Sequence, residues 1–101
     1  DEGALRELVE ETGLVGSIVR LTGAYFEPTH DFGPMQHFVF RCNADPTAQP
    51  RPSSPEISEV GYWPLAHLPG PISDFTERRI RDALRDGPPA VGRIERRQWR
   101  D

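Results

Sequence analysis

The sequence predicts an α+β fold in which two helices pack on a small β-sheet. Two segments have the apolar spacing of helices, residues 1–12 and about 74–86. Three segments are rich in β-branched and aromatic residues, as strands are, at about 17–26, 36–42 and 57–63. Because 101 residues form one domain at most, these elements are expected to share one core.

The first helix is predicted to be amphipathic and to end at Gly13, a residue type that readily adopts the left-handed backbone of a helix end. Its apolar face is formed by Ala4, Leu5, Leu8 and Val9. This face is expected to pack on the core and to leave the polar side of the helix in solvent.

Three carboxylates gather on the polar side of this helix. Glu7, Glu10 and Glu11 lie at positions i, i+3 and i+4, which share one helix face. Like charges at this spacing destabilise a helix by roughly 0.2–0.5 kcal/mol per pair, and last-turn carboxylates oppose the helix dipole. Arg6 can neutralise one of them. The others form either a solvated acidic face or a site for a hard divalent cation such as Mg²⁺, which prefers oxygen ligands.

The strands at 17–26 and 36–42 are predicted to form a hairpin. The second strand alternates in polarity, and one of its faces consists of Phe38, Phe40 and Cys42. Residues 43–55 contain four prolines and are expected to form a flexible surface loop. The third strand, 57–63, is stopped by Pro64.

The second helix has Ser73 or Asp74 as its N-cap, and Gly87 and Pro88 end it. Its buried face is predicted to consist of Phe75, Ile80, Ala83 and Leu84. The domain is placed at residues 1–87. Residues 88–101 are expected to be a basic tail that is either disordered or docked through Ile94 and Trp99, its two large apolar residues.

The net charge of −4 is unevenly distributed. Residues 1–12 carry −4, whereas residues 78–101 carry +4. The acidic end suits a cation, and the basic end could meet a phosphate, a partner or simply solvent. Binding to nucleic acid is not expected, because the tail has one aromatic residue and no recognisable reading motif. The single cysteine excludes an internal disulfide, and without an apolar membrane span or a signal peptide the chain is expected to be cytoplasmic.

The acidic helix resembles a known motif. Residues 6–14, Arg-Glu-Leu-Val-Glu-Glu-Thr-Gly-Leu, look like the second half of the Nudix box, G-x5-E-x7-R-E-U-x-E-E-x-G-U, in which U is aliphatic. Every defined position of that half matches: Arg6, Glu7, Leu8, Glu10, Glu11, Gly13 and Leu14. The resemblance implies the C-terminal part of a Nudix domain, an α/β/α sandwich with a mixed sheet whose N-terminal strands are missing here.

By this resemblance, the chain is expected to hydrolyse the pyrophosphate of a nucleoside diphosphate linked to another moiety. The expected cofactor is Mg²⁺, with Mn²⁺ as a substitute. Glu10 and Glu11 would be metal ligands, Glu7 a metal ligand or the general base, and Arg6 would orient a box carboxylate through a bidentate pair. Some members recruit one more acid from a loop, for which Glu56 is the first candidate and Glu59 the second.

The substrate is predicted less sharply. Pro28 lies fourteen residues after Leu14, near the place where members that act on ADP-ribose tend to carry a proline. ADP-ribose or a similar nucleotide sugar is therefore favoured, and a nucleoside triphosphate stays open. Substrate contacts are expected from Phe26, Pro28, His30 and Phe32.

Other readings remain beside this one. The chain could be a Nudix-like module that senses a nucleotide without hydrolysing it, although such modules usually lose box glutamates and all three visible ones are present. A homodimer is left open. A zinc site at His30, His37 and Cys42 is not expected, because their spacing fits no compact zinc pattern.

Overall fold

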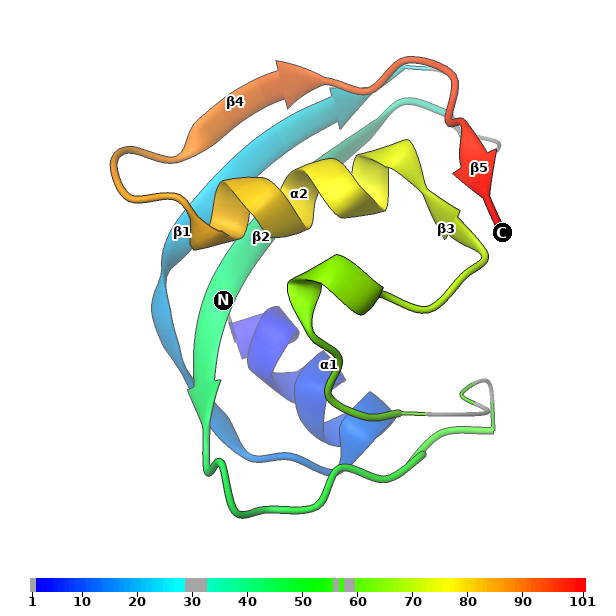
Figure 1. The fold of residues 1–101 in the computed structure, drawn as a ribbon. Helices are drawn as coiled ribbons and strands as arrows, with labels where there is room; N and C mark the ends of the chain where they lie inside the picture. The colour runs from blue at the N-terminus through cyan, green and yellow to red at the C-terminus, as the bar shows by residue number, and fades with distance from the viewer. Residues whose placement is uncertain (1, 29–32, 56, 58–59) are drawn as a thin grey trace. The chain divides into compact units, whose positions relative to one another are not determined.

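The structure, a computed structural model, contains two α-helices, a mixed three-stranded sheet and a two-stranded sheet in its described part (Figure 1). The described residues are 2–28, 33–55, 57 and 60–101. In chain order the elements are α1 (Glu2–Thr12), β1 (Gly16–Glu27), β2 (Met35–Ala44), the 3₁₀ turn η1 (Leu65–His67), β3 (Ile72–Ser73), α2 (Asp74–Leu84), β4 (Ala90–Arg93) and β5 (Trp99–Arg100). This composition confirms the α+β fold expected from the sequence.

The chain divides into two compact units. Unit 1 consists of residues 1–20 and 40–64, and unit 2 of residues 21–39 and 65–101. The long strands β1 and β2 contribute residues to both units. Helix α1 therefore belongs to unit 1, whereas α2 and the strands that follow it belong to unit 2.

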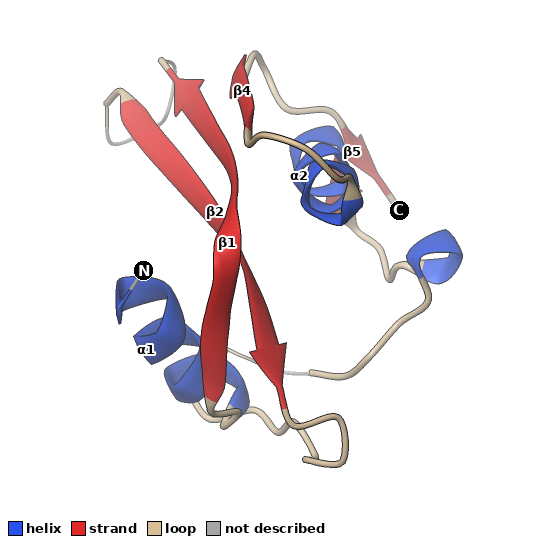
Figure 2. Ribbon diagram, turned by 90° about the vertical axis from the view of Figure 1, so that its left-hand side faces the viewer, coloured by secondary structure: helices blue, strands red, loops and turns tan. Residues whose placement is uncertain are grey.

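The larger sheet has the strand order β2-β1-β4 (Figure 2). Strands β1 and β2 run in opposite directions, which confirms the predicted hairpin. Strand β4 lies parallel to β1, with Ala24 opposite Val91 and Phe26 opposite Arg93. A backbone hydrogen bond of 2.7 Å from the Ile94 nitrogen to the Phe26 carbonyl oxygen continues this pairing.

Residues 88–101, expected to be a basic tail, form two strands instead. Strand β4 completes the sheet beside β1, and β5 pairs with β3 in an antiparallel register that places Ser73 opposite Trp99. Ile94 is buried at 3% exposure, as expected if the segment docks through it. The Trp99 side chain, the other expected docking residue, is 65% exposed. The β4 segment has only four residues, and one of them is a glycine. Such a segment is too short for its apolar periodicity to distinguish a strand from a loop.

The predicted strand at 57–63 is wrong at the residues that the structure describes. Residues 57 and 60–63 have no strand conformation, and residues 58 and 59 lie outside the described part. Tyr62 and Trp63 are 64% and 40% exposed. A strand is stabilised by neighbours across the sheet rather than by its own composition, and no neighbouring strand pairs with the described part of this segment.

The core of unit 2 lies between α2 and the sheet. Tyr25 of β1, Phe75 of α2 and Ile94 form a buried cluster against which Val39 and Ala90 pack. The Tyr25 and Phe75 rings meet edge to face at a centroid distance of 5.3 Å. The Tyr25 hydroxyl donates a 2.6 Å hydrogen bond to the Asp82 carboxylate. Burial, and then this hydrogen bond, raise the pKa of Tyr25 to about 12.

Helix α2 begins where the sequence placed it. Ser73 is the N-cap, because its hydroxyl accepts a 3.2 Å hydrogen bond from the Thr76 backbone nitrogen. Asp74, the alternative cap, occupies the first position of the helix. The prediction of Leu84 as a buried residue is wrong, since it is 52% exposed at the last position of the helix, beyond the reach of the core cluster.

A buried carboxylate ties three parts of unit 2 together. Glu27 ends β1 and is 6% exposed. Both of its oxygens accept hydrogen bonds of 2.9 Å from the Arg97 guanidinium, and one oxygen also lies 2.9 Å from His37 Nε2 on β2. Arg97 and His37 both contact the Phe75 ring. These hydrogen bonds, above all those from Arg97, hold the pKa of Glu27 at about 2 instead of 4.5.

We expect Glu27→Gln to lower the free energy of unfolding at pH 7 by about 2–3 kcal/mol, the lower end of the cost of breaking a buried ion pair, because Arg97 remains partly exposed. The lowered pKa means that Glu27 stabilises the fold above about pH 4.5 and that this contribution is lost as the pH falls toward 2. Denaturant unfolding of wild type and variant across this range measures both effects.

Asp86→Asn is the matched control, since Asp86 is exposed and its loss should leave the acid limb of the stability profile unchanged. If Glu27→Gln and the wild type lose stability in parallel from pH 4.5 to 2, the Glu27 pair does not carry the acid sensitivity.

Candidate functional site

The candidate site is the acidic side of α1, in unit 1. Glu7, Glu10 and Glu11 are all exposed. The Arg6 Nε atom lies 3.7 Å from the Glu10 carboxylate, and both side chains are more than 60% exposed. This is one contact rather than the bidentate pair that the motif resemblance implied. Exposed pairs of this kind contribute little to stability, so the carboxylates remain available to a ligand.

The donor chemistry of this face suits a hard divalent cation. Carboxylate oxygens are the ligands that Mg²⁺ prefers, and Mg²⁺ is usually held by one or two carboxylates while it keeps several waters. No three acidic, histidine or cysteine side chains converge on a metal position in the described ranges of the chain. The arrangement therefore fits a cation held by one or two carboxylates of this face, and not a closed protein cage.

The apolar side of α1 packs close to the base of the β1–β2 hairpin. A methyl group added at Gly16 would lie 2.7 Å from the Asn43 carbonyl oxygen and 2.9 Å from a Leu8 methyl group. Leu14 is buried at 7% exposure. Val9, predicted to lie on the apolar face, is 43% exposed, because it sits at the margin of that face. No residue of α1 is buried, so its apolar side is covered only in part, and the carboxylates lie on the exposed side.

The end of α1 is closed by backbone hydrogen bonds. Gly13 has φ +73° and its nitrogen donates to the Val9 carbonyl oxygen at 2.9 Å, which confirms its predicted role as the helix cap. The backbone nitrogens of Arg51 and Ser53 donate to the carbonyl oxygens of Thr12 and Glu11, at 2.9 and 3.2 Å. The loop that was expected to be flexible thus satisfies two of the carbonyls that a helix end leaves unpaired.

The other predicted site residues are only partly within the description. The Phe26 side chain is 40% exposed, and Pro28 is half-buried. His30, Phe32, Glu56 and Glu59 lie outside the described residues. These four stay predictions.

Sequence reasoning missed two sets of supporting residues. Arg51 and Ser53 act through backbone nitrogens, so their side chains gave no signal, and the four prolines around them indicated only a loop. Glu27 and Arg97 are 70 residues apart, and nothing in local spacing joins an acid at a strand end to one of the chain's twelve arginines.

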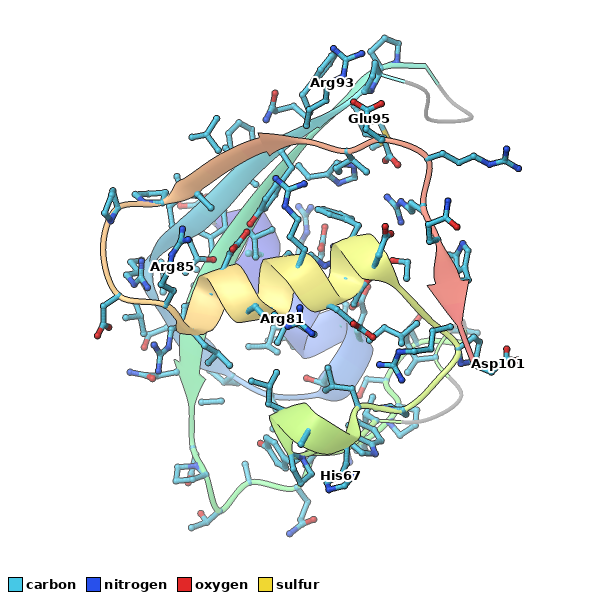
Figure 3. All side chains as sticks on the ribbon, turned by 45° about the horizontal axis from the view of Figure 1, so that its top comes forward. His67, Arg81, Arg85, Arg93, Glu95 and Asp101 are labelled. Carbon is cyan, nitrogen blue, oxygen red and sulfur yellow. The ribbon has the colours of Figure 1, made fainter. Side chains whose placement is uncertain are left out.

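Two hollows of unit 2 are lined by described residues, and neither of these two includes a residue predicted for the site. One, of about 430 Å³, is lined by Leu65, Ala66, Leu68, Glu77, Arg81 and Arg100. The other, of about 330 Å³, is lined by Asp74, Phe75, Arg78, Arg93, Ile94, Glu95 and Arg96. Figure 3 shows Arg81 on α2 and the neighbouring Arg93 and Glu95 at the end of β4.

Among the described residues, no helix is both long and apolar enough to cross a membrane.

Comparison with known proteins identifies the family. The model of the NUDIX domain matches residues 1–84. No curated protein and no solved structure matches the chain. The matched region contains the whole of α1 with its exposed carboxylates, the β1–β2 hairpin and α2. Because the family model covers most of the chain, this protein belongs to the Nudix family.

Proposed function

We propose that this chain is part of a pyrophosphohydrolase that cleaves a nucleoside diphosphate linked to another moiety. The observation that carries the proposal is the set of exposed carboxylates on α1, at the spacing of the Nudix box, in a chain that matches the NUDIX domain. In such a hydrolysis a water oxygen bonds to phosphorus, the bridging P–O bond breaks, and a base accepts the water proton.

The proposed roles follow the chemistry of each side chain. Glu10 and Glu11 hold the cation, Glu7 serves as a further ligand or as the base, and Arg6 positions Glu10. Mg²⁺, or Mn²⁺ in its place, would neutralise phosphate charge and lower the pKa of bound water. The protein's own contribution is to hold the carboxylates outward on a capped helix, where they need not reorganise during the reaction.

The substrate and the base are proposed in more detail. ADP-ribose or a similar nucleotide sugar is the favoured substrate, on the position of Pro28 after the box, and Phe26 is exposed enough for its ring to contact a ligand. His30 and Phe32 are proposed as further substrate contacts. Glu56 is proposed as an additional acid that accepts the water proton.

Glu11→Gln in the full-length protein is expected to lower kcat/KM for ADP-ribose by roughly 100-fold or more, as for other groups that stabilise transition-state charge. The glutamine keeps the size of the side chain but removes its charge. Hydrolysis is followed by chromatographic separation of the products with Mg²⁺ present, and circular dichroism checks the fold.

The control is Glu2→Gln, which removes one charge from the same helix outside the box and should keep activity within about twofold. Full activity in both Glu10→Gln and Glu11→Gln would reject α1 as the catalytic face. Nucleotide binding without turnover in the wild type would favour the sensing module instead.

Mn²⁺ is expected to bind this chain saturably. The double variant Glu7→Gln/Glu11→Gln should lose that binding, because it removes the proposed ligand Glu11 and the further candidate ligand Glu7 and leaves Glu10 alone. Calorimetric titration measures Mn²⁺ binding directly. The melting temperature should rise with Mn²⁺ only in the wild type, since a ligand that binds the native state stabilises it. Equal heats for wild type and double variant would place the cation elsewhere.

A further inference from the structure

The basic C-terminal part of the chain, which the proposed hydrolysis does not use, surrounds a hollow of about 330 Å³ in unit 2. The hollow lies between the first turns of α2 and the residues that end and follow β4. Its floor is apolar, formed by Phe75 and Ile94, each 3% exposed. Its rim carries three arginines, Arg78, Arg93 and Arg96.

Two contacts position the Arg78 guanidinium, and neither of them neutralises its charge. One of its terminal nitrogens donates a 3.0 Å hydrogen bond to the Arg93 carbonyl oxygen, and its guanidinium carbon lies 5.2 Å from the centre of the Tyr25 ring. A guanidinium has five N–H donors, so most of them remain for a ligand. Within the described part of the chain, no ion pair joins Arg78 or Arg96 to a carboxylate.

The two carboxylates at the hollow do not neutralise its rim. One Asp74 oxygen already accepts hydrogen bonds from the backbone nitrogens of Phe75 and Gln98, at 2.8 and 3.0 Å. Glu95 lies 3.1 Å from Arg93, but its side chain is 77% exposed, and such a pair is weak in water. Three guanidiniums against two carboxylates leave the hollow net positive.

We propose that this hollow binds a phosphate group through Arg78, Arg93 and Arg96. Guanidinium forks match the oxygens of a phosphate and bind them with paired, charge-assisted hydrogen bonds. All three arginines are exposed. Arg78 supplies a donor that its contacts position, and Arg93 and Arg96 close on the anion. The ligand class is a small phosphate or phosphate monoester. The proposal goes beyond the hydrolysis, since it needs neither a metal nor the carboxylates of α1.

The other hollow of unit 2 provides a contrast. Its two arginines, Arg81 and Arg100, both form ion pairs with Glu77, whose carboxylate lies between them. Its remaining lining is largely apolar. Arg81 is thus a matched control residue: it lies on the same helix as Arg78 and is 73% exposed, but it does not line the proposed phosphate site.

The test is a titration of the chain with inorganic phosphate in the presence of EDTA. Changes in the backbone amide NMR shifts report the binding. EDTA removes divalent cations, so the carboxylates of α1 cannot hold phosphate through a metal. Saturable shifts are expected at residues 93–96 and in the first turn of α2, and sodium chloride at equal ionic strength should not produce them. Arg96→Gln should weaken binding roughly tenfold, the loss of one hydrogen bond to a charged group.

Two further variants make the outcome decisive. Arg81→Gln removes the same charge and should leave the dissociation constant unchanged. Glu95→Gln should tighten binding several-fold, because it frees Arg93 and removes a repelling charge, and a gain of this kind cannot arise from unfolding. Absence of saturation, equal losses in Arg96→Gln and Arg81→Gln, or weaker binding in Glu95→Gln would overturn the proposal. None of these measurements depends on whether the protein hydrolyses a nucleotide.

Discussion

Unit 2 depends on the pairing of one buried carboxylate with one arginine. Glu27 is the last residue of β1, and burying its charge would be costly without partners. Arg97 supplies two hydrogen bonds to it, and in doing so fixes the segment between β4 and β5. His37 adds a contact from β2. The Phe75 ring, which both Arg97 and His37 touch, then lies against Tyr25 in a core whose members come from β1, α2 and the residue after β4.

Unit 1 carries carboxylates at the C-terminal end of α1, where the helix dipole disfavours negative charge. The structure compensates through the backbone rather than through charge. Gly13 turns the chain, and two nitrogens of the following loop cover carbonyls of the last turn. Among the described residues, the ion pair of Arg6 is with Glu10. Stability of α1 therefore comes from its closed end and its contact near Gly16, and its acidic face stays exposed.

The sequence revealed what is encoded locally. The α1 motif, the Gly13 cap, the hairpin and the Ser73 cap all follow from residue types at short spacings, and the structure contains each of them. It did not reveal β4, because a four-residue strand has too few alternating positions and depends on β1 for its pairing. The predicted strand at 57–63 shows the converse, since suitable composition does not make a strand without a neighbour. Glu27 and Arg97 could not be paired, because their contact is set by tertiary structure alone.

The parallel pairing of β4 with β1 has a consequence for where the chain can be shortened. Trimming at residue 87, the boundary that the composition suggests, would remove β4 and uncover the edge of β1. Backbone groups of Gly23 to Phe26 would then be free to recruit a strand from another molecule. The same cut would remove Arg97 and leave the Glu27 carboxylate with His37 as its remaining side-chain partner among those described. A fragment that ends at residue 87 would consequently be prone to self-association, although it kept every residue of the acidic motif.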